Sequence, residues 1–106
     1  MPTLSRDTNL QTVITTFEVS PATCEDLLDE VRESYEAFIR HQPGFVGAAI
    51  HGNDARTRIA IYSQWRRRED FQAMLRAEEM RARMRRINAL CRTFEPVMYD
   101  LTDTFD

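Results

Sequence analysis

The chain has 106 residues, of which 42% are hydrophobic and 29% are charged, with three glycines and four prolines. This length allows one domain with a single core, and we take residues 1–9 as an N-terminal extension and residues 10–106 as that domain. A net charge of −3 and a pI near 5.4 do not favour nucleic acid as a partner. The first nine residues contain no apolar block, so we expect no signal peptide, no membrane span and a cytoplasmic location.

A strand followed by a helix is expected at the start of the domain. Residues 10–19, LQTVITTFEV, are rich in β-branched and aromatic types and predict a strand. Ser20 and Pro21 fit the N-cap and the first position of a helix. Apolar residues then recur at spacings of three and four: Cys24, Leu27, Leu28, Val31, Tyr35, Phe38 and Ile39. This pattern predicts an amphipathic helix that ends before Pro43 and Gly44.

The second half of the chain predicts a hairpin, a helical region and a last strand. Residues 45–51 and 58–65 read as two strands around the turn-rich GNDART. Residues 68–90 have helical periodicity that slips at residues 76–79, where we expect a bend or two shorter helices. Residues 94–105 predict a strand at the sheet edge, because Pro96 cannot donate a ladder hydrogen bond.

Charge is divided between the two halves of the chain. Residues 66–92 carry nine arginines and four acids, whereas residues 1–55 carry three arginines and nine acids. The first helix is therefore expected to be acidic and the second helical region basic.

The order β-α-β-β-α-β predicts an α+β, ferredoxin-like fold with an antiparallel sheet and both helices on one face. Apolar residues are nevertheless expected on both faces of the strands: Phe45 and Ala49 against Val46 and Ile50, and Ile59 and Ile61 against Ala60 and Tyr62. Helices on one face cannot cover both. We therefore expect a homodimer that joins through the open sheet face.

Three stretches carry a resemblance to a known family. They are QPGFVGAAIH after the first helix, YSQW at the end of the third strand, and the arginine-rich helix that follows. Over residues 10–104 the chain resembles the antibiotic biosynthesis monooxygenase family of dimeric α+β barrels. The resemblance implies a cofactor-independent monooxygenase that uses molecular oxygen, without metal, flavin or haem, on an electron-rich aromatic substrate such as a polyketide anthrone or a small quinol.

The resemblance also implies roles for individual residues. Trp65 and Arg85 match residues that bind and position the aromatic substrate, and His51 matches a candidate proton acceptor. Substrate-binding walls are expected from Tyr62, Phe71, Met74, Met80 and Met84.

The chain departs from the family pattern at two positions. Phe71 lacks a phenolic hydroxyl present in relatives, and Ile61 replaces an asparagine whose amide helps to hold the substrate. These changes put the specific anthrone reaction in question.

Each assignment has an alternative. Trp65 and the aromatic and methionine residues could be core, Arg85 a solvated surface residue, and His51 a polar strand end. A non-redox polyketide cyclase or an aromatic-ligand binding protein is the main functional alternative. Haem degradation is disfavoured because residues 68–90 contain no histidine, and RNA binding because the strands lack the expected basic-Gly-aromatic pattern.

Overall fold

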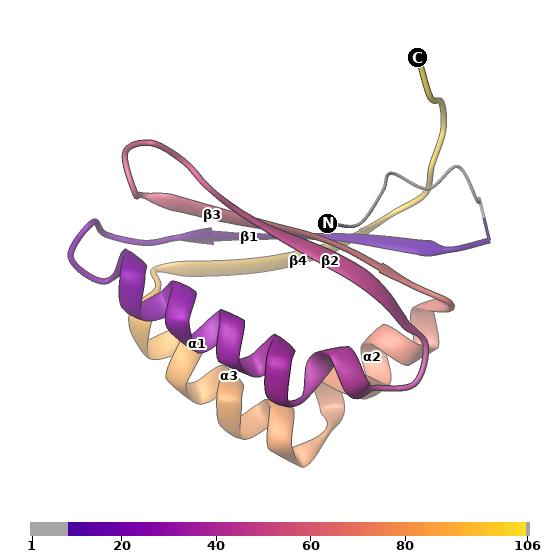
Figure 1. The fold of residues 1–106 in the computed structure, drawn as a ribbon, viewed down its shortest axis with the longest axis horizontal. Coiled ribbons are helices and arrows are strands. Elements are labelled where there is room, and N and C mark those ends of the chain that lie inside the picture. Colours follow the sequence, from indigo (N-terminus) through magenta and orange to yellow (C-terminus); the bar gives the residue numbers. More distant parts are fainter. Residues whose placement is uncertain (1–8, 106) are drawn as a thin grey trace.

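The computed structural model describes residues 9–105 and shows a four-stranded antiparallel sheet with three helices on one face (Figure 1). The elements are β1 (Gln11–Glu18), α1 (Cys24–Ala37), a 3₁₀ turn (Ile39–His41), β2 (Phe45–Gly52), β3 (Arg58–Trp65), α2 (Arg68–Arg76), α3 (Glu78–Leu90) and β4 (Thr93–Tyr99). The strand order is β2-β3-β1-β4. The predicted ferredoxin-like α+β fold is confirmed.

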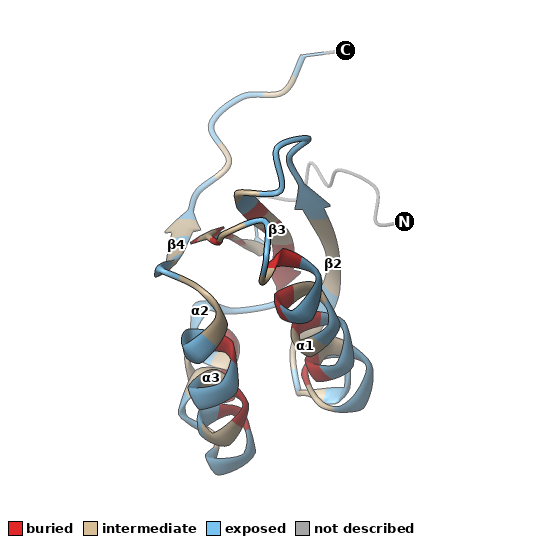
Figure 2. Cartoon of the chain, turned by 90° about the vertical axis from the view of Figure 1, so that its left-hand side faces the viewer, coloured by how far each residue is buried: buried red, intermediate tan, exposed pale blue. Residues whose placement is uncertain are grey.

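The pleat of β1 and β3 sends alternate side chains to the helices. Val13, Thr15 and Phe17 of β1 are buried, and β3 buries Ile59 and Ile61 on the same face. The register pairs Thr15 with Ile61 and Phe17 with Ile59, so these side chains stand side by side beneath the helices. Figure 2 shows the buried residues on the sides of the helices and strands that face each other.

The faces of β2 differ from the prediction because a bulge interrupts its ladder with β3. Phe45 pairs with Trp65, but Gly47 pairs with Gln64, so Val46 is an extra residue. Phe45 and Ile50 therefore both pack against the core, whereas simple alternation had placed them on opposite faces. A bulge leaves no clear signal in the periodicity of so short a strand.

The first helix begins later than Ser20 and Pro21 indicated. Residues 21–23 form a turn in which the Thr23 N–H donates to the Ser20 carbonyl at 3.1 Å, and Thr23 is the N-cap of α1. The Thr23 hydroxyl donates instead to the Leu90 carbonyl at 3.1 Å. The later start of α1 is therefore accompanied by a hydrogen bond from its N-cap residue to the end of α3.

The second helical region is divided, as predicted. Ala77 has φ −61° and ψ 140°, which ends α2 and starts α3. The last strand was predicted to be too long: β4 ends at Tyr99, and residues 100–105 are irregular. The prediction of an edge position is confirmed, since β4 pairs only with β1 among the described strands.

The face of the sheet opposite the helices is open in the single chain. Val46, Val97 and Tyr99 expose 45%, 41% and 47% of their surface. The expected extension, residues 1–9, lies outside the described residues except for Asn9. Within residues 9–105, no helix has the length and apolar character that crossing a membrane requires.

Gly44 is required at the turn into β2. Its φ is +83°, a region that L side chains rarely adopt, and its carbonyl accepts a hydrogen bond from the Arg66 N–H at 2.7 Å. A Cβ at this position would overlap the side chain of Asp70, including its own Cβ.

Gly44→Ala should therefore lower the free energy of unfolding by about 1–2 kcal/mol or more, through strain at positive φ and the overlap with Asp70. Gly52→Ala is the matched control, because nothing lies within 4 Å of a Cβ there. Urea unfolding of both variants provides the measurement, and equal stabilities would contradict the argument.

Candidate functional site

A small cavity lies between the sheet and the helices, with a volume of about 40 Å³. The sheet contributes Thr15, Phe17, Ile61 and Phe94 to its wall. The helical layer contributes Val31, Ser34, Tyr35, Ile39, Phe71, Met74, Leu75, Met80, Met84 and Ile87. The wall is mainly apolar, and its polar side chains are the hydroxyls of Thr15, Ser34 and Tyr35.

Four of the residues expected to bind substrate lie together around this cavity. Phe71 and Met74 come from α2, and Met80 and Met84 come from α3. Their helical spacing turns them toward the sheet, where Phe71, Met74 and Met80 are almost fully buried. Methionine side chains are flexible and polarisable, so this wall can adapt to the shape of a ligand.

Trp65 lies beside the cavity and is fully buried, with 0% of its surface exposed. Its ring meets Phe45 at a centroid distance of 5.3 Å and Phe71 at 5.7 Å, both edge to face. The Nε1–H of Trp65 is buried without a hydrogen-bond partner among the described residues. The indole does not itself line the cavity, but it contacts the ring of Phe71, which does.

Tyr62 and His51 lie on the other face of the sheet. Tyr62 is adjacent in β3 to the inward-facing Ile61 and pairs with Ala49, while His51 pairs with Ala60 and is exposed. Neither lines the cavity. The sequence correctly placed His51 near the end of the second strand and Tyr62 within the third. The pleat of the sheet directs both side chains away from the helices.

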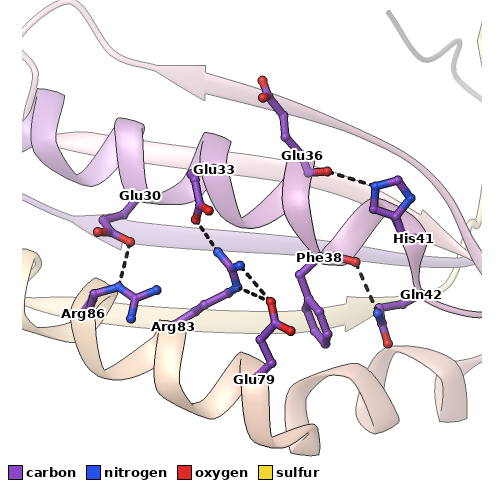
Figure 3. Close-up of polar contacts among 9 residues, drawn as sticks. All are labelled: Glu30, Glu33, Glu36, Phe38, His41, Gln42, Glu79, Arg83 and Arg86. Carbon is purple, nitrogen blue, oxygen red and sulfur yellow. Dashed lines mark hydrogen bonds and ion pairs between the residues drawn. The ribbon is translucent and has the colours of Figure 1, made fainter.

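Arg85 is exposed on α3 and does not line the cavity. The arginine that turns inward is Arg83, which is only 8% exposed and lies between α1 and α3 (Figure 3). Its guanidinium donates to Glu33 of α1 and, at 2.8 Å, to Glu79 of α3. The hydrogen bond to Glu79, followed by that to Glu33, raises the pKa of Arg83, which stays charged.

Arg83 could have been identified from helical spacing. It follows Met80 by three residues and precedes Ile87 by four, and both are buried. Arg83 therefore lies on the stripe that faces the rest of the protein, whereas Arg85 is two residues further along and points outward.

Ser34 and Tyr35 of α1 were not predicted from the sequence as site residues, although Tyr35 was placed on the apolar stripe of the helix. Ser34 is 0% exposed, and its Oγ has no hydrogen-bond partner among the described residues. Burial raises the pKa of Tyr35 to about 12, and the Ser63 hydroxyl offsets part of this rise. The signal for Ser34 was its position three residues after Val31, where the buried stripe of the helix contains a polar residue.

The chemistry available in the cavity is hydrogen bonding by neutral hydroxyls. The described residues that line it include no carboxylate, imidazole or guanidinium. Across residues 9–105, no group of three or more His, Cys, Asp or Glu side chains is placed to hold a metal ion. The wall can therefore desolvate an aromatic ring and donate hydrogen bonds to its oxygen atoms, but it supplies no charged acid or base.

The cavity must enlarge to admit an aromatic ligand. A volume of about 40 Å³ exceeds the roughly 10–15 Å³ that a water molecule needs but lies far below the about 300–1,000 Å³ of typical ligand pockets. The flexible methionines and the break between α2 and α3 at Ala77 are the parts of the wall best suited to move.

The sequence was also compared with those of known proteins. A model of the antibiotic biosynthesis monooxygenase family matches residues 10–86, which is most of the chain. The chain belongs to this family. It is also 38% identical over 74 residues to tetracenomycin-F1 monooxygenase of Streptomyces glaucescens; the match covers 70% of this chain and 66%, just under two thirds, of that protein.

Solved structures agree on the fold. The putative antibiotic biosynthesis monooxygenase of Nitrosomonas europaea superposes with a TM-score of 0.77 at 19% identity, over 92% of this chain and 94% of its own. SnoaB, a cofactor-independent oxygenase of Streptomyces nogalater, superposes with a TM-score of 0.72 at 20% identity, over 90% of this chain and 95% of its own. A Streptomyces coelicolor monooxygenase in complex with nanaomycin D superposes with a TM-score of 0.75 at 23% identity, over 90% of this chain and 89% of its own.

The two arginines of α3 should differ in their effect on stability. Arg83→Ala removes a buried side chain and its pairs with two half-exposed glutamates, so the free energy of unfolding should fall by about 1–2 kcal/mol. Arg85→Ala should change it by less than about 0.5 kcal/mol, because the side chain is exposed. Urea unfolding tests both, and a larger loss for Arg85→Ala would contradict the orientation of α3.

Proposed function

We propose that this protein is a cofactor-independent monooxygenase that oxidises an electron-rich aromatic substrate, a polyketide anthrone or a small quinol, with molecular oxygen. The observation that carries the proposal is a small, mainly apolar cavity with neutral hydroxyls in its wall, in a chain of the antibiotic biosynthesis monooxygenase family. The relative with 38% identity acts as a monooxygenase, and SnoaB is described as cofactor-independent.

The cavity suits such a reaction in three ways. An apolar wall excludes water from a reactive carbanion or phenolate, and it admits dioxygen, which is itself apolar. Hydroxyls aimed at the substrate oxygen stabilise the negative charge that develops when the ring loses a proton. Adaptable methionines hold the ring in place while it reacts.

For an anthrone, the reaction balances without another reductant. The ring methylene loses a proton to solvent base, and the carbanion transfers electrons to O₂. One oxygen atom bonds to the carbon, and the O–O bond then breaks. The methylene becomes a ketone, and its two hydrogens leave with the second oxygen atom as water. The substrate therefore supplies all the electrons, and the protein binds, orients and stabilises the anion.

Four residues that were predicted to act on the substrate, Trp65, His51, Arg85 and Tyr62, do not line the cavity. Trp65 is assigned to the substrate site through Phe71, which lines the cavity and contacts the indole; substrate would reach the indole after Phe71 moves. His51, Arg85 and Tyr62 are proposed to act from outside the cavity, since the described wall does not include them.

A second candidate is a non-redox polyketide cyclase or aromatic-ligand binding protein. Ile61 favours it, because this residue lines the cavity and is only 3% exposed at the position where the resemblance leads us to expect an amide. Such a protein would bind the same aromatic rings and consume no oxygen.

Oxygen uptake by chelator-treated protein with a panel of anthrones and dihydroxynaphthalenes separates the two candidates. We expect uptake above the uncatalysed rate that chelation leaves unchanged. Met80→Glu, which places a charge in the cavity wall, should reduce it at least tenfold, because burying an unpaired carboxylate disfavours binding of an apolar ring. Arg81→Glu on the exposed face of α3 is the control. Aromatic binding without uptake would support the second candidate.

We also propose a homodimer that forms through the open sheet face. Val97 of β4 and Val46 of β2 are exposed on the single chain although they are large and apolar. A two-fold partner that packs sheet against sheet would cover them.

Light scattering at micromolar concentration should give the mass of a dimer. Val97→Asp should shift the protein toward monomer, because a carboxylate would be buried at the interface. Ala73→Asp, on the exposed side of α2, should leave the mass unchanged. A monomeric wild-type protein would refute the dimer.

A further inference from the structure

Ser34 is a polar residue at a buried position, where its hydroxyl lowers the stability of the folded protein. It lies on the buried stripe of α1, three residues after Val31, and its Oγ is fully enclosed without a partner in the described part of the chain. Serine within a helix commonly donates to the carbonyl four residues earlier, and Ser34 Oγ makes no such bond here. A buried hydroxyl without a partner destabilises the folded state, so this position favours the hydroxyl only if something else binds it.

The surroundings of Ser34 show what it faces. It lines the cavity together with Tyr35, the next residue of α1. The Tyr35 ring lies against Phe45 at a centroid distance of 6.1 Å. With its pKa raised to about 12, the phenol is neutral at ordinary pH and can donate a hydrogen bond. Two residues with hydroxyls therefore line the cavity from one turn of one helix. The Ser34 hydroxyl has no partner among the described residues, and the Tyr35 hydroxyl interacts with that of Ser63.

The wall that the sheet forms has few hydrogen-bonding groups. Ile61 of β3 lines it, and its cross-strand neighbour Thr15 supplies the only described hydroxyl of the sheet wall. The polar side of the cavity is thus formed mainly by α1.

We propose that α1 is the specificity wall of this pocket, in which Ser34 Oγ and Tyr35 Oη bind a ketone or phenolic oxygen of the aromatic substrate. The identity of the ligand rests on the proposed function, whereas the location of the hydrogen bonds rests on the cavity. A ligand oxygen satisfies the buried Ser34 hydroxyl, and a ring without oxygen leaves it unpaired. Such a site prefers the oxygenated ring to an isosteric hydrocarbon.

The test compares two ligands of the same shape, a naphthol and the methylnaphthalene that carries its methyl group at the same ring position. Calorimetry with the wild-type protein should show tighter binding of the naphthol, by about tenfold for one net hydrogen bond. Ser34→Ala should remove about that factor for the naphthol and leave methylnaphthalene binding unchanged. Tyr35→Phe should reduce the preference in the same direction, and Ser34→Thr, which keeps the hydroxyl, should preserve it.

Thermal unfolding separates recognition from folding. Ser34→Ala should keep or raise the melting temperature, because it removes an unpartnered buried hydroxyl. Thr23→Ala is the matched control on α1: it removes a hydroxyl bonded to the Leu90 carbonyl, so it should lower the melting temperature and leave the ligand preference unchanged.

The outcomes distinguish this inference from the proposed function. An unchanged preference in Ser34→Ala, an equal loss for both ligands, or no naphthol binding by the wild-type protein would overturn the inference, even if oxygen uptake is observed. A preference that depends on Ser34, in a protein that consumes no oxygen with any aromatic tested, would uphold the inference and refute the monooxygenase.

Discussion

The packing of Trp65 is the interaction on which the arrangement of the site depends. Its indole is fully buried where β3 ends. Trp65 pairs with Phe45 of the neighbouring strand and contacts the Phe71 ring edge to face. Phe45 in turn contacts Tyr35 of α1. One aromatic series therefore ties α1, two strands and α2 together. Because Phe71 is part of both this series and the cavity wall, the same contacts that position α2 also shape the cavity.

The cavity that results has two chemically different sides. α2 and α3 provide flexible, apolar side chains such as Met74 and Met80, and α1 provides the hydroxyls of Ser34 and Tyr35. Enlarging the space by moving α2 or the methionines would leave the hydrogen-bonding groups in place on α1. This division lets the apolar wall adapt to a ring while the polar wall stays in one position.

Charge explains how the two longest helices lie together. The acidic face of α1 and the arginines of α3 form ion pairs across the helix interface, Glu33 with Arg83 and, at 3.3 Å, Glu30 with Arg86 (Figure 3). Most of these side chains are partly exposed, so each pair contributes little to stability. Their main effect is on the register of the helices, since a shift by one turn would separate the pairs.

Much of the fold could be predicted because it follows from short-range patterns. Alternation located the strands, helical spacing located α1, and its slip located the break at Ala77. The errors occurred where a long-range contact prevails over a local preference: α1 starts at Cys24 beside a hydrogen bond from Thr23 to Leu90, and β4 stops at Tyr99, the last residue that pairs with β1. The bulge at Val46 changed the faces of β2 by adding one residue to the strand.

By itself the sequence determined the family, the order of the elements and the apolar residues Phe71, Met74, Met80 and Met84 that surround the cavity. Only the tertiary structure decided the direction of the polar side chains, placing Arg83 rather than Arg85 inside, His51 and Tyr62 on the open face, and Ser34 against the cavity. The physical reason is that apolar burial repeats with the period of the helix or strand. A polar side chain, in contrast, is placed by one specific partner or by one specific gap, and these come from elements distant in the chain.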